Sequence, residues 1–261
     1  LLNARITKKS FERWSKFKKI SSYIFSKIDI AYPQNNETLN YLKKLKVSKI
    51  KTIGNLKFSE NSKENILQID KSFTSATKNR KMWCASSTHS NEELICGQIH
   101  LNLKKKYPNL LTILIPRHTQ RTKEVKNDLE KLGLNIILRS SKVKIKRTTD
   151  IYLVDTYGET KKFYKTCNTV FLGGSIVEHG GQNPLEAARL GSTIIHGPNV
   201  KNFKEVYKLL NDKNIAFKAN NPKALNQLIS SSFKKVKTNN EYQKIKKIGQ
   251  TILTETTKEI N

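Results

Sequence analysis

A short apolar strand that runs into a glycine-rich loop and a helix start is the feature that most constrains the fold. The strand reads Thr-Val-Phe-Leu at 169–172, and the loop holds two glycine pairs, at 173–174 and 180–181. A helix start follows at 183–186, which reads Asn-Pro-Leu-Glu. Glycine lets backbone N–H groups approach a ligand, and a helix start presents unpaired N–H groups with partial positive charge. The stretch therefore predicts an α/β fold with a site for a phosphate or a carboxylate.

Alternating strand and helix patterns extend this prediction over most of the chain. Apolar strand patterns occur at 81–86, 110–115, 135–138, 151–154, 168–172, 193–196 and about 214–218, and helical patterns at 91–105, 120–132, 160–166, 184–190, 201–210 and 222–233. Such alternation predicts a parallel sheet with helices on both faces. Ligands of such sheets bind beyond the carboxyl ends of the strands, which is where the polar motifs of this chain fall.

The first fifty residues predict a different unit. A basic amphipathic helix is indicated where large apolar residues recur three or four positions apart, at Phe11, Trp14, Phe17, Ile20, Ile24 and Phe25. This helix lies either on an anionic membrane surface or in a core with a lysine-rich outer face. A strand over Ile28–Tyr32, a helix over Asn36–Leu45 and a strand over Ile50–Ile53 follow. They predict the β-α-β end of a first domain.

The formal net charge of +28 in 261 residues favours an anionic partner. Nucleic acid, an anionic membrane leaflet and a phosphorylated lipid all fit the charge, as do solvated lysines with no partner. No zinc-finger, helix-turn-helix or aromatic RNA-binding motif supports nucleic acid. The cysteines, Cys84, Cys96 and Cys167, lack metal-ligand spacing and read as small buried thiols.

Polar motifs also follow the first two strands of the predicted sheet. Ser90 and Glu93 match a helix capping box, but that reading leaves Thr88 and His89 unexplained. Arg117, between Pro116 and His118, offers a planar fork for phosphate or carboxylate, although surface arginines are common.

Two later motifs likewise have a structural and a functional reading. Asp155 caps a helix near 160, or the loop at 157–159 contacts a base or ribose. Asn183 as N-cap and Glu186 at the third helical position explain a capped helix start, but not the four glycines upstream. His179 has no second ligand at metal-binding spacing.

Together these motifs resemble the bacterial 3-deoxy-D-manno-octulosonic acid (Kdo) transferases, from Leu2 to about residue 210. The shared wording is Ser-Thr-His at 87–89, Pro-Arg-His-x-x-Arg at 116–121, Asp-Thr-x-Gly-Glu at 155–159, the stretch at 173–186, and Gly-Asn-Leu-Lys-Phe at 54–58. The departures are Ser90-Asn91 for an acidic residue and a glycine, Tyr157 for Met, Thr160 for an apolar residue, and Gln182 for His.

The resemblance implies a role for each motif. Lys57 is implied to stabilise the transition state, where negative charge develops on the departing phosphate. The implied nucleotide-binding residues are Pro116, Arg117, Tyr157, Gly158, Glu159, Asn183, Pro184, Leu185 and Glu186. The implied cleft residues are Thr88, His89, His118, Gly173, Gly174, Ser175, His179 and Gly181. The resemblance implies neither a metal nor a cofactor.

The resemblance also implies a reaction and a place. Kdo moves from CMP-Kdo to the lipid A precursor, lipid IVA, with inversion, at the cytoplasmic face of the bacterial inner membrane. The expected partners are CMP-Kdo, the lipid A precursor and an anionic membrane surface, and no nucleic acid is expected. The alternatives are an inactive CMP-binding remnant of a split or decayed gene, and another nucleotide-sugar enzyme of the same two-domain class, such as a UDP-sugar transferase or epimerase.

The implied architecture is that of a GT-B type glycosyltransferase of the α/β class. We expect a Rossmann-like, parallel-sheet C-terminal domain at 81–240, which binds the nucleotide sugar. Residues 1–55 are expected to be a remnant of the acceptor-binding N-terminal domain, residues 56–80 a linker, and residues 241–261 a basic helix or tail. The glutamate that serves this family as general base has no counterpart here, so we expect an N-terminally incomplete chain without that base.

Overall fold

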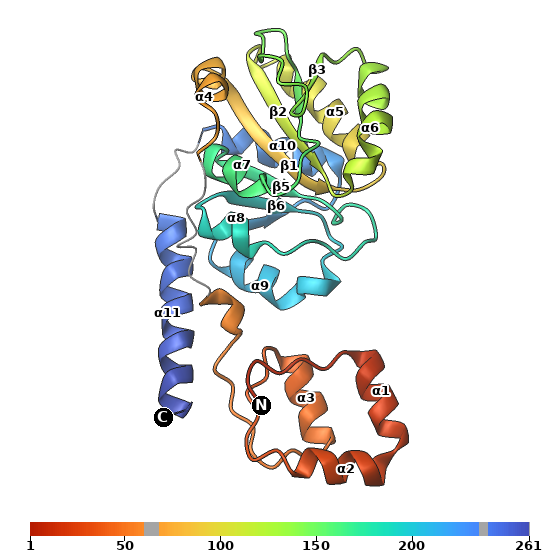
Figure 1. The fold of residues 1–261 in the computed structure, drawn as a ribbon, viewed down its shortest axis with the longest axis vertical. Helices are drawn as coiled ribbons and strands as arrows, with labels where there is room; N and C mark the ends of the chain where they lie inside the picture. The colour runs from red at the N-terminus through yellow and green to blue at the C-terminus, as the bar shows by residue number, and fades with distance from the viewer. Residues whose placement is uncertain (60–67, 235–239, 261) are drawn as a thin grey trace. The chain divides into compact units, whose positions relative to one another are not determined.

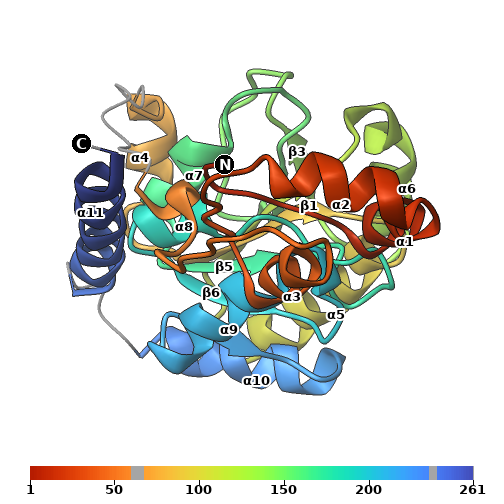
Figure 2. The ribbon, with the colours of Figure 1, turned by 90° about the horizontal axis from the view of Figure 1, so that it is seen from below.

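The computed structural model describes the backbone of residues 1–59, 68–234 and 240–260. The chain divides into two compact units (Figures 1 and 2). The first unit contains Leu1–Lys63 and Gln243–Asn261, and the second contains Glu64–Tyr242. Each unit is described by itself.

The second unit is built on a seven-stranded parallel sheet, as the alternating pattern predicts. Its strands are β1 (Lys81–Thr88), β2 (Leu110–Pro116), β3 (Ile136–Leu138), β4 (Ile151–Leu153), β5 (Thr169–Leu172), β6 (Thr193–His196) and β7 (Ala216–Lys218). They lie in the order β3-β4-β2-β1-β5-β6-β7. The chain therefore fills one side of β1 and then crosses to the other side at β5. In such sheets the ligand-binding crevice lies at this crossing, beyond the carboxyl ends of the strands.

Helices cover both faces of the sheet. They are α4 (Lys71–Thr77), α5 (Glu92–Lys104), α6 (Thr122–Glu130), α7 (Thr160–Thr166), α8 (Leu185–Arg189), α9 (Lys204–Asp212) and α10 (Pro222–Ser232), with short 3₁₀ turns η2 (Thr119–Arg121) and η3 (Lys201–Phe203). In Figure 1, α7 and α8 lie in front of the sheet, and α5 and α10 lie behind it. Side chains of α5, α6 and α10 share one apolar core with the strands, around the fully buried Trp83. Within it, α6 packs on α5 and on the edge strand β3.

The middle residues of the central strands are mostly apolar because both faces of these strands are covered. Every residue of β2 is buried, as are Trp83, Cys84 and Ala85 of β1. All three cysteines are buried and free, which confirms the reading of small buried thiols. The buried apolar surface of these strands fixes the register in which their carboxyl ends meet.

The first unit contains α1 (Lys8–Lys16), α2 (Lys18–Ser26), α3 (Asn36–Lys44), the turn η1 (Leu56–Phe58) and all of α11 (Asn240–Ile260) beyond Tyr242. The single amphipathic helix expected over the first aromatic residues is wrong, because the helix breaks at Phe17 (φ −113°, ψ 59°). The break brings the Trp14 and Phe25 rings to 5.4 Å, edge to face. In one straight helix, residues eleven positions apart are separated by about 16 Å.

The two strands expected in this unit are also wrong. Among the described residues, the segments around 31 and 50 form only isolated parallel bridges, Ala4 with Pro33 and Ala31 with Ile50. A single bridge gives extended backbone rather than a ladder. α11 completes the unit: Glu259 accepts hydrogen bonds from Tyr32 (3.1 Å) and Lys51 (2.6 Å). Gly249 of α11 lies so close to the carbonyl of Phe58 that a Cβ there would approach it to 2.3 Å.

Candidate functional site

Three of the predicted motifs meet at the carboxyl ends of β1, β5 and β2. The amide of Arg117, just after β2, donates to the carbonyl of Thr88 at the end of β1 (2.9 Å). The amide of Gly173, just after β5, donates to the carbonyl of Ser86 (2.8 Å). Thr88 and Pro116 are buried, whereas Arg117 and His118 are exposed. Backbone hydrogen bonds therefore hold these strand ends together. The exposed side chains of Arg117 and His118 lie at their edge, which is termed the rim.

Three histidines from three different loops form a cluster at this rim. The ring of His89 lies with its centroid 3.8 Å from that of His179 and 5.9 Å from that of His118. The side-chain amide of Gln182 donates to Nε2 of His89 (3.2 Å), so this nitrogen carries no proton in that contact. Burial, followed by the neighbouring His179, His118 and Arg117, lowers the pKa of His89 to about 4. His89 is therefore neutral near pH 7.

The glycines of the loop serve packing within the protein. A Cβ at Gly173 would lie 2.5 Å from the carbonyl oxygen of Ser87, so only glycine lets β5 run this close to the end of β1. Gly174 and Gly181 have φ of 63° and 75°, a region that favours glycine, and the Gly181 amide donates to the Gly174 carbonyl (2.7 Å). Gly180 also has a positive φ, of 98°. The loop is thus a closed, packed structure rather than an open cradle.

Glu92, which the sequence reasoning missed, fills the inside of this loop. It is the first residue of α5 and is fully buried. Its carboxylate accepts from the backbone amides of Gly174 (2.6 Å), Ser175 (3.1 Å) and Ile176 (2.9 Å). It also accepts from the amide of His89 (3.0 Å) and, at 3.5 Å, from that of Val177. The sequence around Glu92 did not reveal this role, because the loop amides that it binds lie more than eighty positions further along the chain.

The capping box predicted at Ser90 and Glu93 is wrong. α5 begins one residue later than that box requires, and its N-cap is Asn91 in a left-handed conformation (φ 73°) with no side-chain cap bond. The buried carboxylate of Glu93 instead accepts from the guanidinium of Arg121 (3.0 Å). Arg121 also pairs with Glu124, so its fork is engaged by carboxylates of its own chain.

The helix start at 183–186 differs by one residue from the predicted arrangement. α8 has five residues, its N-cap is Pro184, and Glu186 is its second residue rather than its third. The side chain of Asn183 accepts from the Leu185 amide (3.1 Å). Pro184 and Leu185 are buried, whereas Asn183 and Glu186 are exposed and so accessible to a ligand.

The motif at 157–159 follows β4, on the other side of β2 from the histidine cluster. The Glu159 carboxylate accepts two hydrogen bonds from the Arg139 guanidinium (both 3.0 Å) and one from Lys162 (2.8 Å). The pairing with Arg139 lowers the pKa of Glu159 to about 2. Glu159 also lines a cavity of about 470 Å³ between α4 and the loop that follows β3. Tyr157 and Gly158 are exposed, whereas the Glu159 carboxylate is already paired with Arg139 and Lys162 of the same unit.

Lys57 lies in the first unit, within η1. Asn55 holds the turn, because its side-chain oxygen accepts from the Lys57 amide (3.0 Å). The Leu56 amide donates to the side chain of Asn3 (3.2 Å). Lys57 is exposed.

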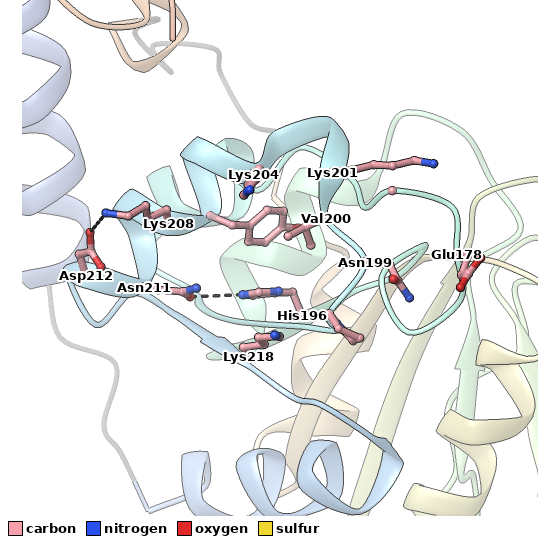
Figure 3. Close-up of a pocket in the computed structure, with 13 residues that line it drawn as sticks. Glu178, His196, Asn199, Val200, Lys201, Lys204, Lys208, Asn211, Asp212 and Lys218 are labelled. Carbon is pink, nitrogen blue, oxygen red and sulfur yellow. Dashed lines mark hydrogen bonds and ion pairs between the residues drawn. The ribbon is translucent and has the colours of Figure 1, made fainter. Parts of the chain in front are cut away.

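A pocket lined by several lysines, which the sequence did not predict, lies at the ends of β6 and β7 (Figure 3). It is a cavity of about 530 Å³ lined by Lys201, Lys204, Lys208 and Lys218, and it shares Glu178 and Gly180 with the glycine-rich loop. Figure 3 shows His196 at its centre, bonded to Asn211 (3.2 Å). In the part of the chain that the structure describes, no group of three or more histidine, cysteine or acidic side chains is arranged to hold a metal ion.

Known proteins match both units. A model of the 3-deoxy-D-manno-octulosonic-acid transferase family matches residues 1–60. The 3-deoxy-D-manno-octulosonic acid transferase of Haemophilus influenzae is 35% identical over 217 residues, which cover 80% of this chain and 50% of that protein. The transferase of Rickettsia prowazekii is 31% identical over 239 residues, which cover 88% and 50%. This chain thus spans about half the length of the curated relatives it matches.

A solved structure matches the sheet unit. The C-terminal CMP-Kdo binding domain of WaaA from Acinetobacter baumannii superimposes with a TM-score of 0.60 and 25% identity, over 70% of this chain and 96% of that domain. The match confirms the predicted Rossmann-like, parallel-sheet domain of GT-B type. From sequence and fold together, the chain belongs to the Kdo transferase family.

Proposed function

We propose that the second unit binds CMP-Kdo at the carboxyl ends of β1, β2 and β5, and that the protein serves the transfer of Kdo. The observation that carries the proposal is the exposed basic rim made by Arg117 and His118, beside His179 of the glycine-rich loop. This rim lies at the crossing point of the sheet, in a domain that matches a CMP-Kdo binding domain. A planar guanidinium suits both anionic groups of such a donor, its phosphate and its carboxylate.

The remaining nucleotide contacts are proposed from the same motifs. The exposed Glu186 would accept hydrogen bonds from the ribose hydroxyls, and the exposed side-chain amide of Asn183 would donate to the phosphate. The buried Pro184 and Leu185 would hold both residues in place. The backbone at Tyr157 and Gly158 would meet the base, with Glu159 fixing this loop through its pairs with Arg139 and Lys162. The buried Pro116 would set the direction of Arg117. Thr88, Gly173, Gly174, Ser175 and Gly181 would shape the floor of the site.

The proposed reaction is inverting transfer of Kdo from CMP-Kdo to the lipid A precursor, lipid IVA. Lys57 would offset the negative charge that develops on the departing CMP phosphate. The reaction as proposed uses no metal and no cofactor. The general base is not assigned to any residue of this chain.

The proposed place of action is the cytoplasmic face of the bacterial inner membrane, at an anionic surface. Its support is α2, where Phe17, Ile20, Tyr23 and Ile24 are 44–67% exposed on a helix that carries Lys18 and Lys19. An exposed apolar stripe rimmed by lysines suits the interface of an anionic bilayer. No described helix is long and apolar enough to cross a membrane.

Titration calorimetry with CMP tests the donor site. Arg117→Ala removes a charge-assisted hydrogen bond worth about 1.5–3 kcal/mol, so we expect CMP affinity to fall by about tenfold or more. The matched control is Arg147→Ala. Arg147 is an exposed arginine that precedes β4, so it lies at the amino end of a strand rather than at a carboxyl end. Equal CMP affinity in the wild type and Arg117→Ala would remove Arg117 from the site. Tighter binding of UMP than of CMP would favour a UDP-sugar enzyme instead.

A further inference from the structure

The carboxylate of Glu92 occupies a nest of backbone amides inside the glycine-rich loop. Amides 174, 175 and 176 point to it in succession at 2.6, 3.1 and 2.9 Å. Consecutive N–H groups that converge in this way form an anion-binding concavity of the kind that holds phosphate in other proteins. Here the anion is supplied by the protein itself, and the side chain is fully buried.

This contact ties the two sides of the site together. Besides the loop amides, the same carboxylate accepts from the amide of His89, at the end of β1 (3.0 Å). The loop in turn brings Gln182 and His179 against the His89 ring. One buried charge therefore sets the spacing between the β1 end and the β5 loop.

We propose that Glu92 is the positioning residue of the donor site. It keeps the loop in its closed form before any ligand arrives, and it saturates amides 174–176. The anionic group of a ligand is thereby excluded from the loop interior and directed to the rim at Arg117, His118 and His179. The identity of the ligand rests on the proposed function, whereas the role of the carboxylate in the loop does not.

The nature of the contact requires an anion. All the partners of Glu92 named above are N–H donors. A carboxylate, which only accepts hydrogen bonds, therefore fits the nest, whereas a side chain that donates hydrogen bonds does not. Glu92→Gln places an NH₂ group against these donors. Glu92→Ala leaves the nest empty but open to a small anion from solution.

Hydrogen exchange of the loop amides tests the nest directly. We expect at least tenfold faster exchange at 174–176 in Glu92→Gln and Glu92→Ala. Excess acetate should restore the slow exchange in Glu92→Ala, whereas acetamide, which has the same shape and no charge, should not. Glu93→Gln is the control, since Glu93 is a buried neighbour that pairs with Arg121 instead of the loop. Unchanged exchange in both Glu92 variants would overturn the proposal.

CMP calorimetry then tests the positioning role. We expect about tenfold weaker CMP binding in Glu92→Gln, and recovery of CMP binding by Glu92→Ala in acetate. Loss of loop protection with unchanged CMP affinity would show a purely structural contact and would also overturn the proposal. If Glu92→Ala does not fold, Glu92→Gln alone supplies both the exchange and the CMP measurements, because it keeps the volume of the side chain and changes only its donors and acceptors. If the wild type does not bind CMP, the proposed function fails, while the exchange experiment still decides the role of Glu92 in the loop.

Discussion

At the scale of single residues, His89 is a neutral imidazole enclosed by positive or ionisable neighbours. Its pKa of about 4 reflects burial first, and then His179, His118 and the arginines 117 and 121. In the unfolded chain a histidine titrates near pH 6.5. Between about pH 6.5 and pH 4 the unfolded state therefore binds more protons at this position, so His89 lowers stability as the pH falls through that window.

This residue gives a pH dependence that can be measured. An anionic phosphate bound beside His89 raises its pKa, so binding is accompanied by proton uptake. We therefore expect the proton uptake that accompanies CMP binding between pH 7 and pH 5 to be smaller in His89→Asn than in the wild type, as measured by calorimetry in buffers of different ionisation enthalpy. Titration of the ring by NMR checks the first step. A His89 pKa near 6.5 in the free protein would contradict its enclosure in the cluster.

Some residues of the site could be grouped from the sequence, and others could not. His89, Arg117 and Gly173 could be grouped in advance because all three follow strands of one parallel sheet, and such ends share an edge. Glu92 could not be assigned, because a carboxylate at a helix start reads first as a favourable charge on the helix dipole. Its actual partners lie more than eighty positions away, at 174–177.

Among the helices and strands, the buried strands and α3 (Asn36–Lys44) were predictable from the sequence, whereas the division between α1 and α2 was not. β1 and β2 are apolar on both faces, and this pattern fixed their bounds to within two residues. α1 and α2 share one continuous amphipathic pattern, yet Phe17 ends the first helix. The break depends on the packing of Trp14 against Phe25, and the spacing of apolar residues in the sequence does not predict this contact.

The exposed stripe of α2 leads to a membrane-binding prediction. Ile20→Glu together with Ile24→Glu replaces two half-exposed apolar side chains by charges that an anionic surface repels. We expect binding to vesicles that contain phosphatidylglycerol to fall by about tenfold or more, because each buried aliphatic side chain contributes about 1.5–3 kcal/mol. Leu253→Glu on α11, where the leucine is 45% exposed, is the control. Equal sedimentation of all variants with the vesicles would exclude α2 as the contact.

At the scale of the whole molecule, the two units differ in how the chain builds them. The second unit is one continuous segment, whereas the first joins residues from both ends of the chain. α11 contributes Glu259 to Tyr32 and Lys51, and it contributes Gly249 and Ile252 to the backbone around 54–58. The first unit therefore depends on the last helix. The residues proposed to bind CMP before the reaction all lie in the other unit, whereas Lys57, which is proposed to act on the departing phosphate, lies in the first.

Removal of residues 243–261 tests separately the stability of the first unit and the binding of CMP by the second unit. We expect the truncated chain to lose the calorimetric transition of the first unit, since Tyr32, Lys51 and Phe58 lose their α11 contacts. The transition of the second unit and its affinity for CMP should be unchanged within error, because its sheet, Glu92 and Arg117 lie within Glu64–Tyr242. Lys51→Ala is a milder control that removes one exposed ion pair, for which we expect only a small loss of stability. Weaker CMP binding after truncation would mean that the donor site extends beyond the sheet unit, and the assignment of that site to the second unit would then be wrong.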